Sequence, residues 1–244
     1  MISREELKDY AKLKGYNLGQ AEKDYFQEII LFILYSEFGK ELVFKGGTAL
    51  TKCYGFDRFS EDLDFTGAID KDLDRIISKG LRKFYIDFES KKIDNKLVYR
   101  INGPLYANHP NTSCKIIIDI RRESVILEPA IKRIGLHIKE IPMFDVVVMA
   151  EPEIFAEKIR AIFKRDKARD MYDLFYLVKR GVKPDLGLIN KKLSFYSMEF
   201  TITGLREALE KKRPIWDKEL RHLVRSFPGF SEAKRDIHKH ITGK

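Results

Sequence analysis

The most informative segment of this chain begins with Phe44-Lys-Gly-Gly-Thr-Ala-Leu-Thr-Lys52. An apolar run over residues 41–45 predicts a short strand, and two glycines follow it directly. Thr48 is a residue type that begins helices, so a short helix is predicted from there. At the turn between them, Gly46 and Gly47 let the backbone approach a ligand closely. The amides at the helix start then form an anion site suited to nucleotide phosphates.

A pair of carboxylates follows in Arg58-Phe-Ser-Glu-Asp-Leu-Asp-Phe65. Asp62 and Asp64 are separated by one residue, so both side chains point to the same face of the strand predicted around residues 63–65. Two like charges this close are costly unless a cation neutralises them, and hard oxygen ligands suit Mg²⁺ or Mn²⁺. The spacing favours a metal site, although a lone Asp-x-Asp pair also occurs at strand edges and in loops.

A third carboxylate, Asp119, lies in the apolar run Lys115-Ile-Ile-Ile-Asp-Ile120, which predicts another strand. An acid among isoleucines is costly without a partner, which makes Asp119 a candidate third metal ligand. The alternative is an acid that pairs with Arg121 or a neighbouring lysine at a strand edge.

The remaining pattern predicts an α+β fold with two domains. The expected helices and strands before residue 150 are these: helices over 3–15, 20–38 and 70–92, and strands over 97–102, 115–121, 135–141 and 144–149. Pro152 then begins a long helical pattern without a convincing strand. We therefore expect a mixed β-sheet with flanking helices over residues 1–150 and a mostly α-helical domain over residues 151–244.

The positive charge of the chain is concentrated in its second half. Residues 1–150 hold 24 Lys and Arg against 23 Asp and Glu, whereas residues 151–244 hold 22 against 14, a net +8. This asymmetry favours a surface that meets a polyanion, most directly nucleic acid. The candidate RNA contacts are Lys211, Lys212 and Arg213. The alternative is a solvated surface rich in charged residues.

Composition excludes several other classes of protein. With 44% hydrophobic residues the chain can build a core, and its longest apolar stretch, Ile29–Tyr35, is far shorter than the ~20 residues of a membrane span. The first ten residues lack the apolar region of a signal peptide, so we expect a cytoplasmic protein without a membrane partner. Two cysteines are better interpreted as small buried side chains than as a disulfide or a zinc site.

A second group of charged residues lies in Ala156–Ile162 and Arg165–Leu174. Lys158 and Arg165 share one helical stripe and could together hold a triphosphate. The alternative is ordinary amphipathic packing, with solvated basic tips and with Asp170 as the cap of the next helix.

The order of these motifs resembles that of the AbiEii-type nucleotidyltransferase toxins, a branch of the DNA polymerase β-like nucleotidyltransferase superfamily. The resemblance covers roughly residues 40–180 and rests on Gly-Gly-Thr, a short helix and Arg-x-Ser-x-Asp-x-Asp-Phe. It implies paired metal ligands at Asp62 and Asp64 and a third carboxylate at Asp119. The nucleotide-binding residues that it implies are Gly46, Gly47, Thr48, Ser60, Lys158, Arg165, Asp170 and Asp173.

The chemistry that this resemblance implies is attack by a hydroxyl on the α-phosphate of an NTP, with Mg²⁺ or Mn²⁺ as cofactor. It implies the 3′ end of tRNA as an acceptor, growth inhibition as the result and an antitoxin protein as a partner. Two alternatives remain open at this point. One is a nucleotidyltransferase that modifies a protein or small-molecule hydroxyl, and the other is a nucleotide- or RNA-binding module without turnover.

Overall fold

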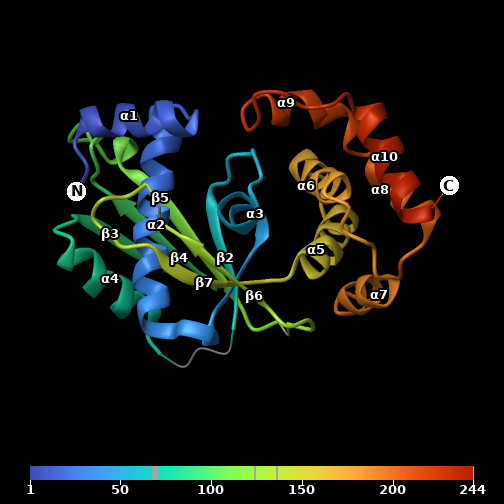
Figure 1. Cartoon of the computed structure of the whole chain (residues 1–244), viewed down its shortest axis with the longest axis horizontal. Helices are drawn as coiled ribbons and strands as arrows, with labels where there is room; N and C mark the ends of the chain where they lie inside the picture. Colours follow the sequence, from blue (N-terminus) through green and yellow to red (C-terminus); the bar gives the residue numbers. More distant parts are fainter. Residues whose placement is uncertain (68–70, 124, 136, 244) are drawn as a thin grey trace. The chain divides into compact units, whose positions relative to one another are not determined.

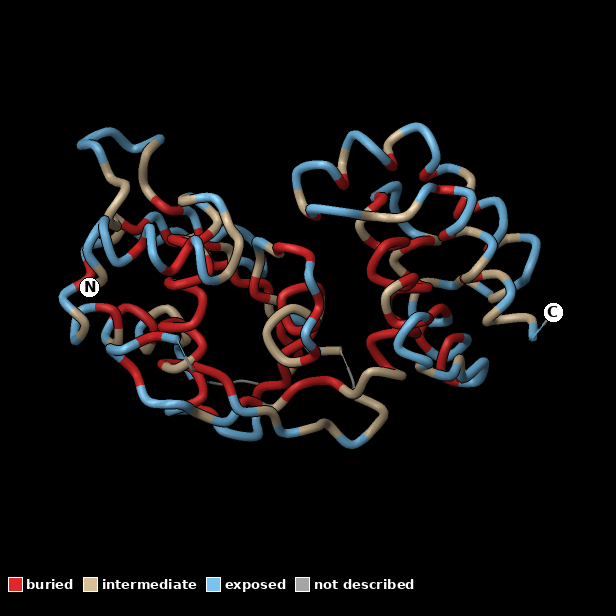
Figure 2. The backbone as a smooth tube through the Cα atoms, turned by 45° about the horizontal axis from the view of Figure 1, so that its top comes forward, coloured by how far each residue is buried: buried red, intermediate tan, exposed pale blue. Residues whose placement is uncertain are grey.

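The chain divides into two compact units (Figure 1). The computed structural model describes residues 1–67, 71–123, 125–135 and 137–243. The first unit comprises residues 1–55, 59–125 and 129–148, and the second comprises 56–58, 126–128 and 149–244. The second unit thus includes two short segments that come from far earlier in the chain. In Figure 2 the buried residues gather inside each unit, and the exposed residues lie in its outer loops and on the outer sides of its helices.

The first unit is built on a seven-stranded sheet of order β3-β4-β5-β2-β1-β7-β6. Its strands are β1 (Val43–Lys45), β2 (Asp62–Thr66), β3 (Phe88–Ile93), β4 (Lys96–Ile101), β5 (Cys114–Arg121), β6 (Ala130–Ile134) and β7 (Phe144–Val148). The pairs β2–β5 and β1–β7 are parallel and the other four are antiparallel. The mixed sheet expected from the sequence is therefore confirmed.

Four helices flank this sheet: α1 (Arg4–Lys14), α2 (Leu18–Phe38), α3 (Gly46–Tyr54) and α4 (Leu73–Lys83). A capping box fixes where each of the first two helices begins. The side chain of Ser3 or Asn17 accepts a hydrogen bond from a backbone amide of the first turn, and the side chain at that position accepts one from the backbone amide of Ser3 or Asn17. Helix α2 contacts α1, α4, β5 and β7. It buries fourteen residues, ten of them apolar, which makes it the main helix of the core.

The structure differs from the sequence-based expectation in one predicted helix and one predicted strand, and β6 was not predicted. The helix predicted over 70–92 ends at Lys83, because Tyr85 takes a positive φ of 54° and the chain then enters β3. The strand predicted over 135–141 is wrong in its described residues, since β6 ends at Ile134 and Gly135 turns the chain with φ of 93°. Residues 70 and 136 lie outside the described part.

The second unit is helical. Its helices are α5 (Glu151–Lys164), α6 (Ala168–Lys179), α7 (Leu186–Ser194), α8 (Ile202–Glu210), α9 (Trp216–Leu220) and α10 (Phe230–Thr242). Helix α5 contacts α6, α7 and α8, and α6 contacts α9 and α10, so these two helices form the centre of the unit. Trp216 is fully buried and its indole N–H donates to the carbonyl of Pro228 at 3.0 Å. The expected helical second half is confirmed.

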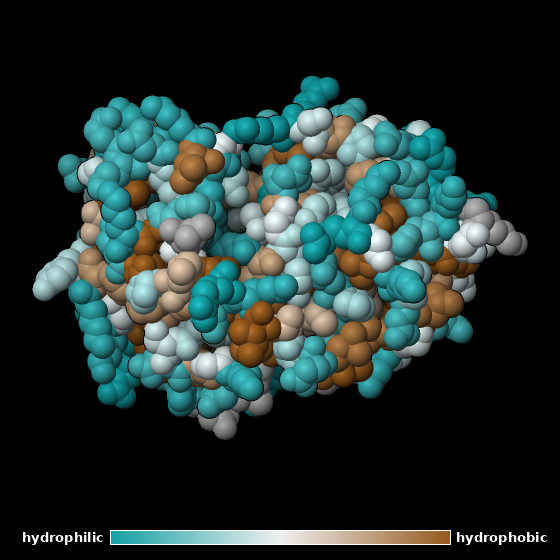
Figure 3. Space-filling model, in the orientation of Figure 1, coloured by the Kyte–Doolittle hydropathy of each residue, from teal (hydrophilic) through white to brown (hydrophobic). Residues whose placement is uncertain are grey.

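The surface seen in Figure 3 is mostly hydrophilic, with apolar side chains in small separate patches. Among the described helices, none is long and apolar enough to cross a membrane.

Candidate active site

The acidic residues of the first unit share one face of the sheet. Along β2, Leu63 and Phe65 are fully buried and alternate with the partly exposed Asp62 and Asp64. Asp64 is the register partner of Asp119 on the parallel neighbour β5. Because paired residues of adjacent strands point to the same side, the structure brings all three predicted carboxylates to one face.

Lysines border these carboxylates on both sides. Lys45 of β1 is the register partner of Asp64, and Lys96 of β4 is the register partner of Asp119. A row of four charged residues, Lys96, Asp119, Asp64 and Lys45, therefore crosses four adjacent strands. The cations at its ends lower the cost of placing two carboxylates side by side at its centre.

Asp119 also pairs along its own strand. Its carboxylate lies 3.4 Å from the guanidinium of Arg121 and 3.9 Å from the ammonium of Lys96. The ion pair that the sequence suggested as an alternative is thus present. It occurs together with the placement beside Asp64, so the two interpretations of Asp119 do not exclude each other.

The glycine turn lies directly against Asp64. Gly46 has φ of 79°, and a Cβ at this position would stand 2.5 Å from Oδ2 of Asp64, so both the backbone conformation and the space require glycine. Helix α3 begins at Gly46, two residues before the predicted start at Thr48. Thr48 is buried, and its hydroxyl donates to the carbonyl of Asp62 at 2.5 Å, which ties the start of α3 to β2. Gly47 is buried beside it.

Ser60, the polar residue predicted before the acids, is held through its backbone. Its carbonyl accepts a hydrogen bond from the side-chain amide of Gln27 on α2 at 3.0 Å, and the carbonyl of Glu61 accepts another at 2.9 Å. The loop that leads into β2 is therefore fastened to the core helix.

A buried ion network holds α3 in place, and the sequence analysis missed it. Lys52 of α3 lies 2.7 Å from Asp24 and 3.3 Å from Glu28, both on α2. The hydroxyl of Tyr10 donates to Asp24 at 2.5 Å. Burial acts to raise the pKa of Asp24, but Lys52, Lys14 and the hydrogen bond from Tyr10 together outweigh it and the pKa is lowered. The available signal was the position of Asp24 and Glu28, four residues apart on the face of α2 that also carries the apolar residues of the core.

The carboxylates of this face fit a divalent metal whose coordination shell is completed by ligands from outside the protein. In the part of the chain that the structure describes, no three His, Cys, Asp or Glu side chains form a metal cage by themselves. Mg²⁺ is usually bound through one or two carboxylates together with waters and substrate phosphates. Asp62 and Asp64 on one face, beside the backbone of Gly46, provide carboxylates of this kind.

The second unit gathers the other predicted residues into one buried cluster. Lys158 of α5 lies 2.6 Å from Asp173 and 3.4 Å from Asp170, both on α6. Arg165 makes two hydrogen bonds to Asp170, at 2.7 and 3.0 Å. Lys158 is therefore not a solvated tip, and Asp170 is not a helix cap. Of the two cations, only Arg165 is exposed, with half of its side chain accessible.

Arg58, which begins the Arg-x-Ser-x-Asp-x-Asp-Phe motif but had no role assigned from the sequence, completes this cluster. Its guanidinium makes two hydrogen bonds to Asp173, at 2.8 and 3.1 Å, and its side chain is almost fully buried. Burial raises the pKa of Asp170 in isolation, but Lys158 and Arg165 outweigh it and hold the pKa at about 2. Three cations thus face two carboxylates, which leaves a formal excess of one positive charge.

The predicted RNA contacts are not all on the surface. Lys211 and Arg213 are exposed, but Lys212 is fully buried. Its ammonium lies 2.6 Å from Asp166 and donates to the carbonyl of Ile162 at 3.0 Å. Lys212 therefore holds the segment after α8 against the end of α5, and its ammonium is not exposed for a contact with RNA.

Comparisons with known proteins agree with these features. The family model for the nucleotidyl transferase AbiEii toxin of type IV toxin–antitoxin systems matches residues 29–237. The fold is similar to that of the nucleotidyltransferase toxin MenT4 of Mycobacterium tuberculosis, with a TM-score of 0.71 and 21% identity over 98% of this chain and 88% of that one. It is also similar to JHP933 of Helicobacter pylori, with a TM-score of 0.51 and 21% identity over 90% and 88%. A comparison with curated protein sequences gives no match.

Proposed function

This chain belongs to the AbiEii family of nucleotidyl transferase toxins of type IV toxin–antitoxin systems, and we propose that it transfers a nucleoside monophosphate from an NTP to a hydroxyl at the 3′ end of tRNA. The observation that supports the proposal most directly is the register pairing of Asp64 with Asp119, with Asp62 on the same face. NTP and tRNA meet in the cytoplasm, which is where the proposal locates the reaction.

The proposed reaction exchanges one phosphorus–oxygen bond for another. The acceptor oxygen bonds to the α-phosphorus, the bond from that phosphorus to the oxygen bridging to the β-phosphate breaks, and pyrophosphate leaves. Asp62 and Asp64 would hold Mg²⁺ or Mn²⁺. The metal, when bound, lowers the pKa of the attacking hydroxyl and offsets charge on the phosphates. Asp119 would take the proton of the acceptor hydroxyl as general base.

Two groups of residues would bind the nucleotide phosphates. The amides at the start of α3, from Gly47 and Thr48, form the kind of anion site that a helix N-terminus provides, with Gly46 allowing close approach. In the second unit, the cluster of Lys158, Asp170 and Asp173 would orient Arg165. Its half-exposed guanidinium is the member able to meet a phosphate without breaking the buried pairs.

The acceptor is proposed from charge. The net +8 of residues 151–244 favours a polyanionic substrate over a protein or small-molecule hydroxyl. Membership of a toxin–antitoxin family also leads us to propose a cognate antitoxin as the partner that counteracts the activity.

A labelling experiment tests this function. The purified protein is incubated with each of the four α-³²P-labelled NTPs, total RNA and total protein, with Mg²⁺ or with EDTA, and the products are separated by size and by nuclease or protease digestion. We expect label in tRNA-sized RNA, with Mg²⁺ only. Label in protein would show that the acceptor is a protein and not tRNA. Label in the presence of EDTA would show that the reaction needs no divalent metal. Absence of label in every fraction would contradict the reaction itself.

A further inference from the structure

A groove between α8 and α10 in the second unit is lined almost entirely by basic side chains. Its volume is about 500 Å³. Six of its lining residues can carry positive charge: Arg206, Arg213, Lys234, Arg235, His238 and Lys239. Leu209 and Ser231 complete the lining, so no carboxylate faces the groove among the described residues.

Nearby acids neutralise only part of this charge. Glu210 pairs with Arg213 and Lys234, and Asp236 pairs with Arg235. Arg206 contacts only the ring nitrogen of His238, at 3.2 Å, and within the described residues neither it nor Lys239 has a carboxylate partner. Cations held near one another without acids repel each other. An anion that enters the groove relieves this repulsion, so its binding is favourable.

We propose that the α8–α10 groove binds the phosphate backbone of the RNA acceptor, an inference that rests on the proposed function and locates its substrate contact. Guanidinium, ammonium and hydroxyl donors are the groups that proteins use to contact backbone phosphates. The groove supplies all three kinds, through its arginines, its lysines and Ser231. The groove also gathers six basic residues of the second unit in one place, whereas the Lys211–Arg213 run has its middle residue, Lys212, buried.

The lining favours RNA over an acidic protein. Protein interfaces are anchored by buried apolar or aromatic side chains, whereas Leu209 is the one apolar residue of this groove and is itself already buried. An acidic protein would find there the charged ends and aliphatic stems of basic residues but no exposed apolar side chain.

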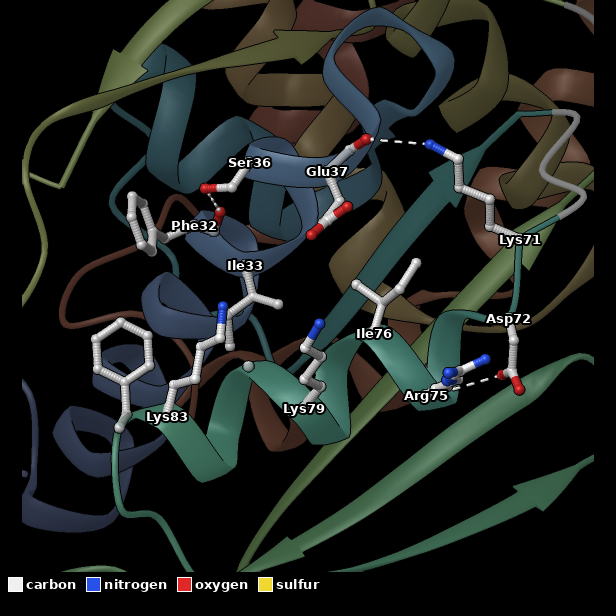
Figure 4. Close-up of a pocket in the computed structure, with 12 residues that line it drawn as sticks. Phe32, Ile33, Ser36, Glu37, Lys71, Asp72, Arg75, Ile76, Lys79 and Lys83 are labelled. Carbon is white, nitrogen blue, oxygen red and sulfur yellow. Dashed lines mark hydrogen bonds between the residues drawn. The ribbon is translucent and has the colours of Figure 1, made fainter.

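A second basic groove, between α2 and α4 of the first unit, provides the matched control (Figure 4). Arg75, Lys79 and Lys83 follow one another at four-residue spacing on α4 and line this groove of about 610 Å³. Its lining also contains Glu37 and Asp72, together with apolar residues of α2 such as Phe32. Acids and apolar side chains make this groove a poorer match for a phosphate backbone.

The test compares two triple variants of the full chain that each remove three exposed helical cations. One is Arg206→Gln, Arg235→Gln and Lys239→Gln, and the control is Arg75→Gln, Lys79→Gln and Lys83→Gln. Filter binding of total tRNA is measured from 50 to 400 mM salt, and circular dichroism checks that both variants are folded. With about 0.7 counterions released per single-strand contact, losing three contacts flattens the log–log salt slope by about 2 and weakens binding about 100-fold at 0.1 M salt.

We expect this loss for the α8–α10 variant, with the control close to wild type. Equal losses in both variants would mean that net charge alone governs binding, and wild-type behaviour of the α8–α10 variant would equally overturn the proposal. If an acidic peptide such as polyglutamate competes with tRNA at equal charge concentration, the groove is a protein site instead. If the wild-type protein neither binds nor labels RNA, the proposed function itself fails. If the wild-type protein binds and labels RNA but the α8–α10 variant behaves like it, only the proposal for the groove fails.

Discussion

Asp64 on β2 and Asp119 on β5 are register partners in adjacent parallel strands, so two carboxylates stand side by side on one face of the sheet. Like charges in directly paired positions destabilise a sheet by several tenths of a kcal/mol. Lys45 and Lys96 flank the pair in the same row and reduce that cost. Such a pair at the centre of the sheet supports the proposed cation site.

The first prediction follows from this arrangement. Asp64→Asn should abolish nucleotidyl transfer, because a neutral amide holds a divalent cation poorly, and should leave the unliganded protein as stable as wild type or more so by about 0.5 kcal/mol. Thermal melting with and without Mg²⁺, alongside label incorporation, measures both effects. Transfer at the wild-type rate would show that Asp64 is not a metal ligand.

A second prediction concerns Gly46. Gly46→Ala should unfold more easily and lose transfer, since alanine is strained at φ of 79° and its Cβ would displace the carboxylate of Asp64. Gly181→Ala is the matched control, because Gly181 has φ of 77° but nothing within 4 Å of the added carbon. Strain alone costs about 1–2 kcal/mol. Urea unfolding should show that cost in both variants, with transfer lost only in Gly46→Ala; equal activity in the two would contradict the close approach.

The sequence predicted what depends on local spacing. The alternation of Asp62 and Asp64 with apolar residues placed both acids on one face, and in β2 both are partly exposed while Leu63 and Phe65 are buried. The positions of Lys45 and Lys96 beside the acids depend on strand register, which short-range spacing does not encode.

Long-range pairing also explains the misjudged basic residues. Lys212 lies in a run of three cations typical of a solvated surface, but its partner Asp166 is 46 residues earlier in the chain. In the same way, the role of Arg58 depends on Asp173, 115 residues later. Neither contact leaves a signal in one sequence, because each exists only after the helices of the second unit have packed.

The third prediction is a dependence of stability on pH. The pKa of Asp170 is about 2 in the folded protein, below its ordinary value of 3.8, so its ionised form stabilises the fold above pH 4. That contribution, about 2 kcal/mol, should be lost as the pH falls from about 4 to about 2. Denaturant midpoints at pH 4.5, 3.5 and 2.5 measure it. Asp170→Asn should be less stable at pH 4.5 and should lack this part of the decline; a parallel decline in both proteins would assign it to other groups.

A fourth prediction concerns the anchor of α3. Lys52→Met should destabilise the protein by about 3–5 kcal/mol, because it leaves Asp24 and Glu28 buried without their cation. Lys8→Met removes a lysine from an exposed pair with Glu5 and should cost less than 1 kcal/mol. Urea unfolding at pH 7 compares them, and a small loss for Lys52→Met would mean that the network does not hold α3.

The last prediction separates nucleotide binding from structure in the second unit. Arg165→Gln should raise the KM for NTP about tenfold while leaving tRNA affinity unchanged, because the guanidinium is half-exposed and would meet a phosphate with a charge-assisted hydrogen bond worth about 1.5 kcal/mol. Lys167→Gln, an exposed cation two residues away, controls for general electrostatics and should behave as wild type. Arg165→Gln should also lose some stability, because it removes two hydrogen bonds to Asp170. Lys158→Met should lose more stability as well as turnover, because Asp170 and Asp173 lose their buried cation. Steady-state kinetics with urea unfolding distinguishes the cases. If Arg165→Gln and Lys167→Gln raise KM equally, the effect comes from the loss of one positive charge in the second unit, wherever it lies. The cluster would then be structural and not a phosphate site.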